Sequence, residues 1–162
     1  DLEAGDAAVV ERPDDVELPP STSSTVPPDP VEVRALAPGA CADDVADEQG
    51  EVPIAIDAVI SGGPVVPRSC EAEHRYELYA TVELAAPDAA WPGPEQIGED
   101  ALRACTDEFE AYVGVAWDQS NLDLAPVVPD EARWATGDRS AWCVLFDVGL
   151  EPLEGSASSS GP

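Results

Sequence analysis

The chain of 162 residues contains no lysine and no methionine, and its positively charged residues are seven arginines. Acidic residues number 34, so the formal net charge is -27 at pH 7. A field of this sign repels nucleic acids, anionic lipid headgroups and polyanionic wall polymers, which argues against a nucleic-acid or membrane-surface function. A cation-binding function would need clustered carboxylates. Asp43, Asp44, Asp47 and Glu51 come nearest, but they do not match the D-x-[DN]-x-[DN]-G calcium loop.

Long apolar runs are also lacking. No stretch approaches the ~20 apolar residues of a transmembrane helix, and no signal peptide is visible. The sequence starts at Asp1 in polar surroundings. We therefore expect a processed fragment whose targeting segment has been removed, so that its location must be inferred from other features.

Residues 1–38 differ in composition from the rest of the chain. They contain seven prolines, nine acidic residues and the run Ser21-Thr22-Ser23-Ser24-Thr25. Proline interrupts helices and sheets, and like charges extend a chain. We predict a disordered acidic linker that holds a folded domain away from an anchor. Residues 154–162 are predicted to be a flexible tail, which leaves residues 39–153 as the folded domain.

The clearest strand pattern covers residues 76–84. Apolar and polar side chains alternate there with a period of two, as in a half-buried strand. One face consists of Tyr76, Leu78, Ala80, Val82 and Leu84, and the opposite face of Glu77, Tyr79, Thr81 and Glu83.

The other elements follow from composition and spacing. Residues 140–148 are apolar almost throughout and are predicted to form a central strand, and residues 52–60 are a further β-rich stretch. Residues 95–112 carry apolar side chains three or four positions apart, which predicts the main helix, whereas residues 116–130 are expected to be irregular. These elements predict an α+β fold, with one main helix packed on a small antiparallel sheet of three to five short strands.

Four cysteines are spread over the domain, at positions 41, 70, 105 and 143. No C-x₂-C pair is present, so a zinc site is only weakly indicated, and a catalytic thiol would have His74 as its only histidine partner. An even number of cysteines in a small domain favours two disulfides, for which three connectivities are possible. Sequential pairing, Cys41–Cys70 and Cys105–Cys143, fits the predicted elements best.

Two groups are candidates for binding or sensing. His74 lies between Glu73 and Glu77, and we hypothesise that these carboxylates raise its pKa, although a structural role is the simpler interpretation. The segment with Trp134, Asp138 and Arg139 could bind a sugar or peptide. We favour the alternative of a tight turn in which Asp138 caps backbone groups, Arg139 pairs with a local acid and Trp134 packs on the core. No catalytic residue is predicted, because no G-x-S-x-G or comparable motif is present. No metal ligand and no cofactor are predicted either.

The order and spacing of these landmarks resemble those of the septum-formation domain of actinobacterial membrane-anchored proteins and lipoproteins. The matching residues are Gly39-x-Cys41, Ser69-Cys70, Glu73-His74, Glu77-Leu78-Tyr79, Ala104-Cys105, Phe109-x₂-Tyr112-Val113-Gly114, Trp134-x₂-Gly137-Asp138-Arg139, Cys143 and Gly155-Ser156. The resemblance implies an extracytoplasmic domain behind a membrane or lipid anchor, with a link to cell division. It implies no established activity or ligand.

From these observations we expect a non-enzymatic accessory or binding module of the cell envelope. Its partner would be wall material or another envelope or division protein, and a segment preceding Asp1 would anchor it to the membrane. The alternative is an envelope sensor of pH or cations, and a small hydrolase is the least favoured interpretation.

Overall fold

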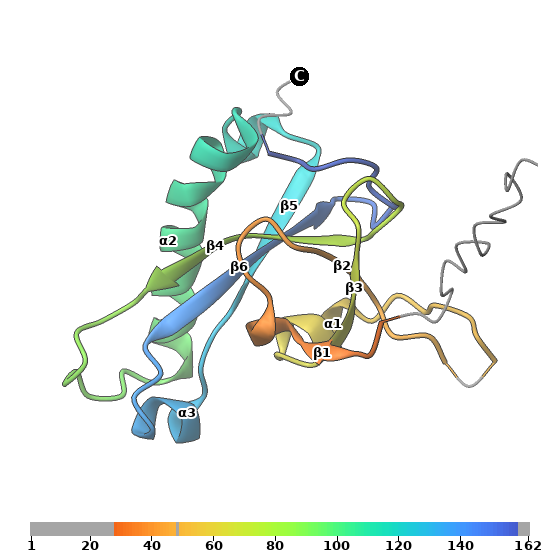
Figure 1. The fold of residues 1–162 in the computed structure, drawn as a ribbon. Helices are drawn as coiled ribbons and strands as arrows, with labels where there is room; N and C mark the ends of the chain where they lie inside the picture. The colour runs from red at the N-terminus through yellow and green to blue at the C-terminus, as the bar shows by residue number, and fades with distance from the viewer. Residues whose placement is uncertain (1–27, 48, 159–162) are drawn as a thin grey trace, which may run out of the picture.

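The computed structural model describes residues 28–47 and 49–158, so the disorder predicted for residues 1–27 lies outside it (Figure 1). The elements, in chain order, are β1 (Val31–Glu32), the 3₁₀ helix η1 (Val33–Ala35), β2 (Cys41–Asp43), α1 (Ile56–Ile60), β3 (Pro64–Arg68), β4 (Tyr76–Glu83), α2 (Pro94–Val113), the 3₁₀ helix η2 (Trp117–Gln119), β5 (Leu122–Val127), α3 (Glu131–Ala135) and β6 (Ser140–Asp147). The predicted α+β class is confirmed.

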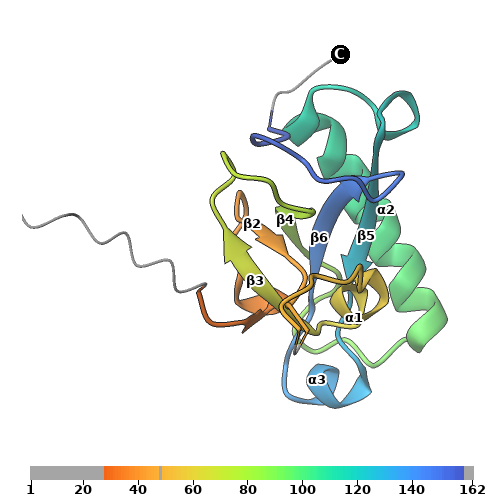
Figure 2. The same ribbon diagram turned by 90° about the vertical axis from the view of Figure 1, so that its right-hand side faces the viewer.

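The strands form one antiparallel sheet in the order β1-β3-β2-β4-β6-β5. It has six strands, more than the three to five expected, because β1 and β2 are too short to give a periodic pattern. Helix α2 lies on one side of β4, β6 and β5, and β1, α1 and β3 lie on the other (Figures 1 and 2). Both faces of the central strands are therefore covered.

Each face of the central strands has its own apolar core. The core under α2 consists of Tyr79, Ala80, Cys105, Phe109, Val113, Leu124, Cys143, Leu145 and Ala157. The core on the α1 side consists of Val33, Ala42, Val59, Val65, Tyr76, Leu78, Ala125, Val127, Val144 and Phe146. Successive strand residues point to opposite faces, which is why β5 and β6 contribute alternately to the two cores.

The strict alternation predicted for β4 is wrong at its middle. The register against β6 shifts between Leu78 and Ala80, so that Tyr79 and Ala80 both join the core under α2. A bulge adds one residue to a strand and breaks its period of two. Glu77, expected on the polar face, is completely buried.

Helix α2 agrees with its predicted range. Pro94 occupies its first turn, and Gly114 ends it in the left-handed conformation, with φ 90° and its N–H donated to the Glu110 carbonyl. The buried stripe is Ile97, Ala101, Cys105, Phe109 and Val113. Leu102 lies outside this stripe and is 47% exposed.

Two predicted segments differ from the structure. Ile56–Ile60 within the expected β-rich stretch is helical, with Ile56, Val59 and Ile60 packed on the core. Positions i, i+3 and i+4 share one face of a helix, but five residues are too few for this period to be distinguished from a strand. Leu122–Val127, expected to be irregular, is the edge strand β5, where Pro126 is tolerated because an edge strand leaves some N–H groups unpaired.

The folded domain is longer than predicted at both ends. Residues Val31 and Glu32 pair with β3, and Val33 is buried in the core, so the ordered part begins before residue 39. Ser156 and Ala157 contact the sheet, so the tail is ordered through residue 158. Within the described ranges, no helix combines the length and apolar composition that a membrane crossing requires.

Candidate functional site

The four cysteines form the two sequential disulfides that the sequence favoured, Cys41–Cys70 and Cys105–Cys143. The second joins α2 to β6 inside an apolar core, and both of its cysteines are completely buried. The first joins β2 to the segment after β3, with Cys41 buried and Cys70 partly exposed. The Cys41–Cys70 bridge lies beside two buried ionisable side chains, His74 and Glu77.

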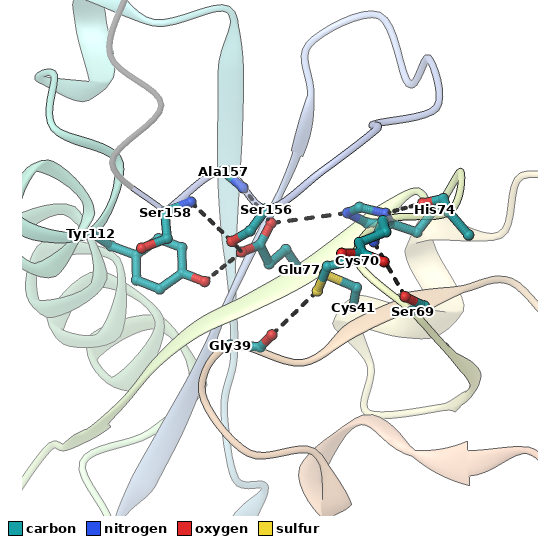
Figure 3. The surroundings of a disulfide bond; sticks show 12 residues. Gly39, Cys41, Ser69, Cys70, His74, Glu77, Tyr112, Ser156, Ala157 and Ser158 are labelled. Carbon is teal, nitrogen blue, oxygen red and sulfur yellow. Dashed lines mark hydrogen bonds and ion pairs between the residues drawn. A yellow bond between two sulfur atoms is a disulfide. The ribbon is translucent and has the colours of Figure 1, made fainter.

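His74 stands next to this bridge, immediately before β4 (Figure 3). Its backbone pairs with Leu153 in both directions, at 3.0 and 2.7 Å, and its ring is fully buried. The ring Nδ1 lies 2.8 Å from the Ala72 carbonyl oxygen, which can only accept, so Nδ1 carries a hydrogen. The other nitrogen, Nε2, faces Glu77 Oε2 at 3.9 Å, which is too long for a hydrogen bond.

Glu77 of β4 is the centre of this site. Its carboxylate accepts hydrogen bonds from the Tyr112 hydroxyl on α2, from the Ser156 hydroxyl at 2.7 Å and from the Ala157 N–H at 2.8 Å (Figure 3). A buried carboxylate is stable only when its oxygens are paired in this way. Glu77 therefore holds helix α2 and the C-terminal segment on the sheet.

His74 and Glu77 shift each other's pKa toward the charged form. Burial lowers the pKa of His74, but the Glu77 carboxylate and the Ala72 carbonyl outweigh that effect, so the pKa lies above its ordinary value. Burial raises the pKa of Glu77, but His74 and the three donors outweigh it, so this pKa lies below its ordinary value. Burial and the bond to Glu77 raise the pKa of Tyr112 to about 12.

The sequence pointed to His74 and to its neighbour Glu77, but it missed the burial of Glu77 and the contacts with Tyr112 and Ser156. The hypothesis that neighbouring carboxylates raise the His74 pKa agrees with the geometry for Glu77, whereas Glu73 is exposed. The partners of Glu77 lie 35 to 80 positions away along the chain. The signal available in the sequence was an acid within a strand whose neighbours Tyr76, Leu78 and Tyr79 are all apolar or aromatic.

Trp134, Asp138 and Arg139 form a structural cluster of their own. The Trp134 ring is buried, donates its Nε1–H to the Ala89 carbonyl at 2.9 Å and lies under the Arg139 guanidinium at 4.0 Å. The sequence suggested that Arg139 pairs with a local acid, which is wrong. Its guanidinium instead donates to the carbonyls of Pro87, Ala89 and Trp134. This cluster fastens the loop before α2 to the α3–β6 turn.

Asp138 stabilises the start of β6. Its Oδ1 accepts the Ser140 N–H at 3.0 Å, which confirms the capping role, and its Oδ2 accepts from Arg34 at 3.1 Å. The exposed platform of the sugar-binding interpretation is not found at this cluster, because the Trp134 ring is covered.

The acidic segment after β2 also has a structural explanation. Asp44 is buried and accepts from the Tyr76 hydroxyl at 2.8 Å and from Arg75 at 3.0 Å. Asp47 accepts the backbone N–H groups of Gln49 and Glu51. Both oxygens of Asp44 therefore accept from protein donors, and Asp47 Oδ1 caps the turn that follows it.

Comparison with known proteins decides the relationship of this chain. The sequence model of the septum formation family matches residues 61–159. The chain belongs to the septum formation family. The match contains His74, Glu77 and three of the four cysteines, whereas Cys41 and β2 precede it. No curated protein and no solved structure matches the chain.

The surface of this septum formation domain carries an open hollow of about 350 Å³ between the start of α2 and the start of α3. Its lining consists of Trp91, Pro94, Ile97, Val128, Pro129, Asp130 and Glu131. Five of these seven residues are apolar and two are acidic, which is a combination suited to an apolar group that is accompanied by positive charge.

Proposed function

We propose that this septum formation domain is an extracytoplasmic, membrane-tethered and non-enzymatic binding module of the cell envelope that acts at the division septum. The two disulfides carry the proposal. Disulfides form and persist in oxidising compartments and are rare in the cytosol, and all four cysteines of the domain are paired. Family membership adds the role related to septum formation.

The state of the histidine supports a binding rather than a catalytic function. A general base must reach the proton that it abstracts. The ring of His74, the only histidine of the chain, is fully buried, with Nδ1 bonded to a carbonyl and Nε2 turned to Glu77. We infer that this buried pair stabilises the fold and takes no part in a reaction.

The partner would be a protein surface that carries basic residues around an apolar side chain. A charge of -27 attracts basic partners and repels anionic wall polymers. The lining of the hollow combines apolar residues such as Trp91 with the acids Asp130 and Glu131. Contact there would combine burial of the apolar side chain with complementary charge.

Imaging of the full-length protein, with a fluorescent tag that matures in the envelope, tests this function in growing cells of the source organism. Enrichment at the division site is expected. A uniform peripheral signal would refute the septal role but not export, and a cytoplasmic signal would overturn both.

The contribution of the hollow is tested in the same cells. The exchange Glu131→Arg should reduce septal enrichment, whereas Glu110→Arg, the same change at an exposed position of α2, should leave it unchanged. Equal enrichment of both variants would exclude the hollow as the binding surface.

Sensing of pH is a second candidate function, favoured by the buried His74–Glu77 pair beside the C-terminal segment. NMR titration of the single histidine should give a pKa above 6.5, its ordinary value. Resonances of Ser156 and Ala157 should shift with the same midpoint if the pair transmits its protonation state. A titration confined to His74 would argue against sensing.

A further inference from the structure

The surroundings of the Cys41–Cys70 bridge have the composition of a metal site. One possible ligand atom each from Cys41, His74 and Glu77 lie within 4.8 Å of one another, and all three residues are buried. Thiolate, imidazole and carboxylate are the three ligand types of protein zinc sites. No second group of three such side chains this close occurs in residues 28–47 and 49–158.

The groups around these side chains orient them as in a metal site. A metal-binding histidine nearly always donates its other N–H to a carbonyl or carboxylate, which fixes the ring. His74 does so through Nδ1 and Ala72, and its buried Nε2 has no hydrogen-bond partner among the described residues.

The Glu77 carboxylate is held in a complementary way. It can accept about four hydrogen bonds. Tyr112 and Ser156 occupy Oε1, and Ala157 occupies one position of Oε2. The remaining position therefore belongs to Oε2, the oxygen that faces His74 Nε2.

We propose that opening of the Cys41–Cys70 disulfide converts this cluster into a zinc site with Cys41, Cys70, His74 and Glu77 as its ligands. A dithiol reductant supplies two electrons and two protons. It becomes a disulfide as the Cys41–Cys70 bond breaks and two thiols form. Zn²⁺ then displaces the two thiol protons to solvent and binds both thiolates.

The distances permit this conversion. With Zn–S bonds of about 2.3 Å in a tetrahedral site, the two sulfurs must lie about 3.8 Å apart. The Cα atoms of Cys41 and Cys70 are 5.2 Å apart, so side-chain rotation can supply this separation while β2 stays in place. Contraction of the remaining ligand distances by about 1 Å would complete a tetrahedron with Zn–N and Zn–O bonds of about 2.1 Å.

Such a site would replace one link between β2 and the segment after β3 with another. In the oxidised protein the disulfide makes this link. In the reduced protein Zn²⁺ would make it, and would also connect it to β4 through Glu77. The site goes beyond envelope binding and does not depend on it.

The first step of the test is selective reduction of the full-length protein under native conditions. Alkylation and peptide mapping should identify Cys41 and Cys70 as the opened pair, because Cys70 is accessible and both cysteines of the other bridge are buried. Zn²⁺ is then titrated into the reduced protein in competition with a chromogenic chelator, and Co²⁺ is used as the spectroscopic probe. The reduced protein should bind one Zn²⁺ at least ~100-fold more tightly than the oxidised protein does. Co²⁺ should show thiolate charge transfer and tetrahedral ligand-field bands.

Matched variants identify the ligands. His74→Ala and Glu77→Gln should each weaken Zn²⁺ binding to the reduced protein at least ~10-fold. Glu110→Gln, which removes an exposed carboxylate, should not change it. Equal affinity of the reduced and oxidised proteins, or of the His74→Ala variant and the wild type, would overturn the proposal. If reduction unfolds the domain, recovery of its circular dichroism with Zn²⁺ supports the site, and failure to recover refutes it.

Discussion

The two disulfides of this septum formation domain close loops of similar length in opposite surroundings. Their sequence separations of 29 and 38 residues correspond to loop entropies that differ by only about 0.2 kcal/mol at room temperature. Cys105–Cys143 lies in an apolar core, whereas Cys41–Cys70 lies beside a buried ion pair and is accessible at Cys70. Differences between the bridges must therefore come from their neighbours and not from the lengths of the loops.

The largest expected changes in the free energy of unfolding come from removing each disulfide in turn. Replacing both Cys105 and Cys143 with alanine should lower the free energy of unfolding by about 4–5 kcal/mol, since cross-link and core packing are lost together. The same exchange at Cys41 and Cys70 should cost about 3–4 kcal/mol, because Cys70 is only partly buried. Urea unfolding followed by tryptophan fluorescence measures both. A larger loss for the Cys41–Cys70 variant would contradict the assignment of the other bridge to the core.

Glu77 provides the next largest effect. Glu77→Ala should cost about 3 kcal/mol, because three donors lose their buried acceptor and His74 loses its charge partner. Glu77→Gln keeps an oxygen acceptor and should cost less. Thermal unfolding compares the two variants, with Glu83→Ala, at an exposed position of the same strand, as control. A cost for Glu77→Ala no greater than that for Glu83→Ala would show that the buried carboxylate does not stabilise the fold.

The pH dependence of the free energy of unfolding is the smallest effect, and it reports on His74 and Glu77 most selectively. Because the folded pKa of His74 lies above 6.5, its charge stabilises the fold fully below pH 6.5, and this contribution is lost as the pH rises through the folded pKa. Because the folded pKa of Glu77 lies below 4.5, its contribution is complete above pH 4.5 and is lost as the pH falls through the folded pKa.

Substitution of His74 and of Glu77 tests separately how stability depends on pH above and below this range. The stability difference between wild type and His74→Gln should be constant from about pH 4.5 to 6.5 and shrink above that window, and the difference for Glu77→Gln should shrink below it. Urea unfolding at closely spaced pH values provides the measurement. The many surface carboxylates affect all three proteins alike, so they cancel in these differences. A pH-independent difference for His74→Gln would show that the ring does not change charge on folding.

The sequence predicted those elements of the fold that leave a local pattern. Alternation marked β4, three-four spacing marked α2, and the even number and placement of cysteines favoured the correct pairing. Helix α1 and strand β5 were not recognised. Five helical residues give too little periodicity, and Pro126 is compatible with a strand only once β5 is known to lie at an edge.

The site itself was predictable only in part. His74 was noticeable as a single residue, but burial of Glu77 depends on Tyr112, Ser156 and Ala157, which only the tertiary structure brings to it. The bulge after Leu78, which breaks the alternation, has no signature in the local sequence either. Burial of a charge in a strand is decided by distant donors, and a local pattern cannot report them.

The contact between Glu77 and Ala157 spans 80 positions of the chain, which has a consequence for synthesis. The chain is made from its N-terminus, so β4 exists long before the residues that neutralise its buried acid. Until Ser156 and Ala157 have left the ribosome, this carboxylate remains hydrated and the core under α2 cannot close around it. The domain therefore completes its folding only after residues 156 and 157 have been made. A chain that delays its folding in this way can still pass through a narrow pore in an unfolded state.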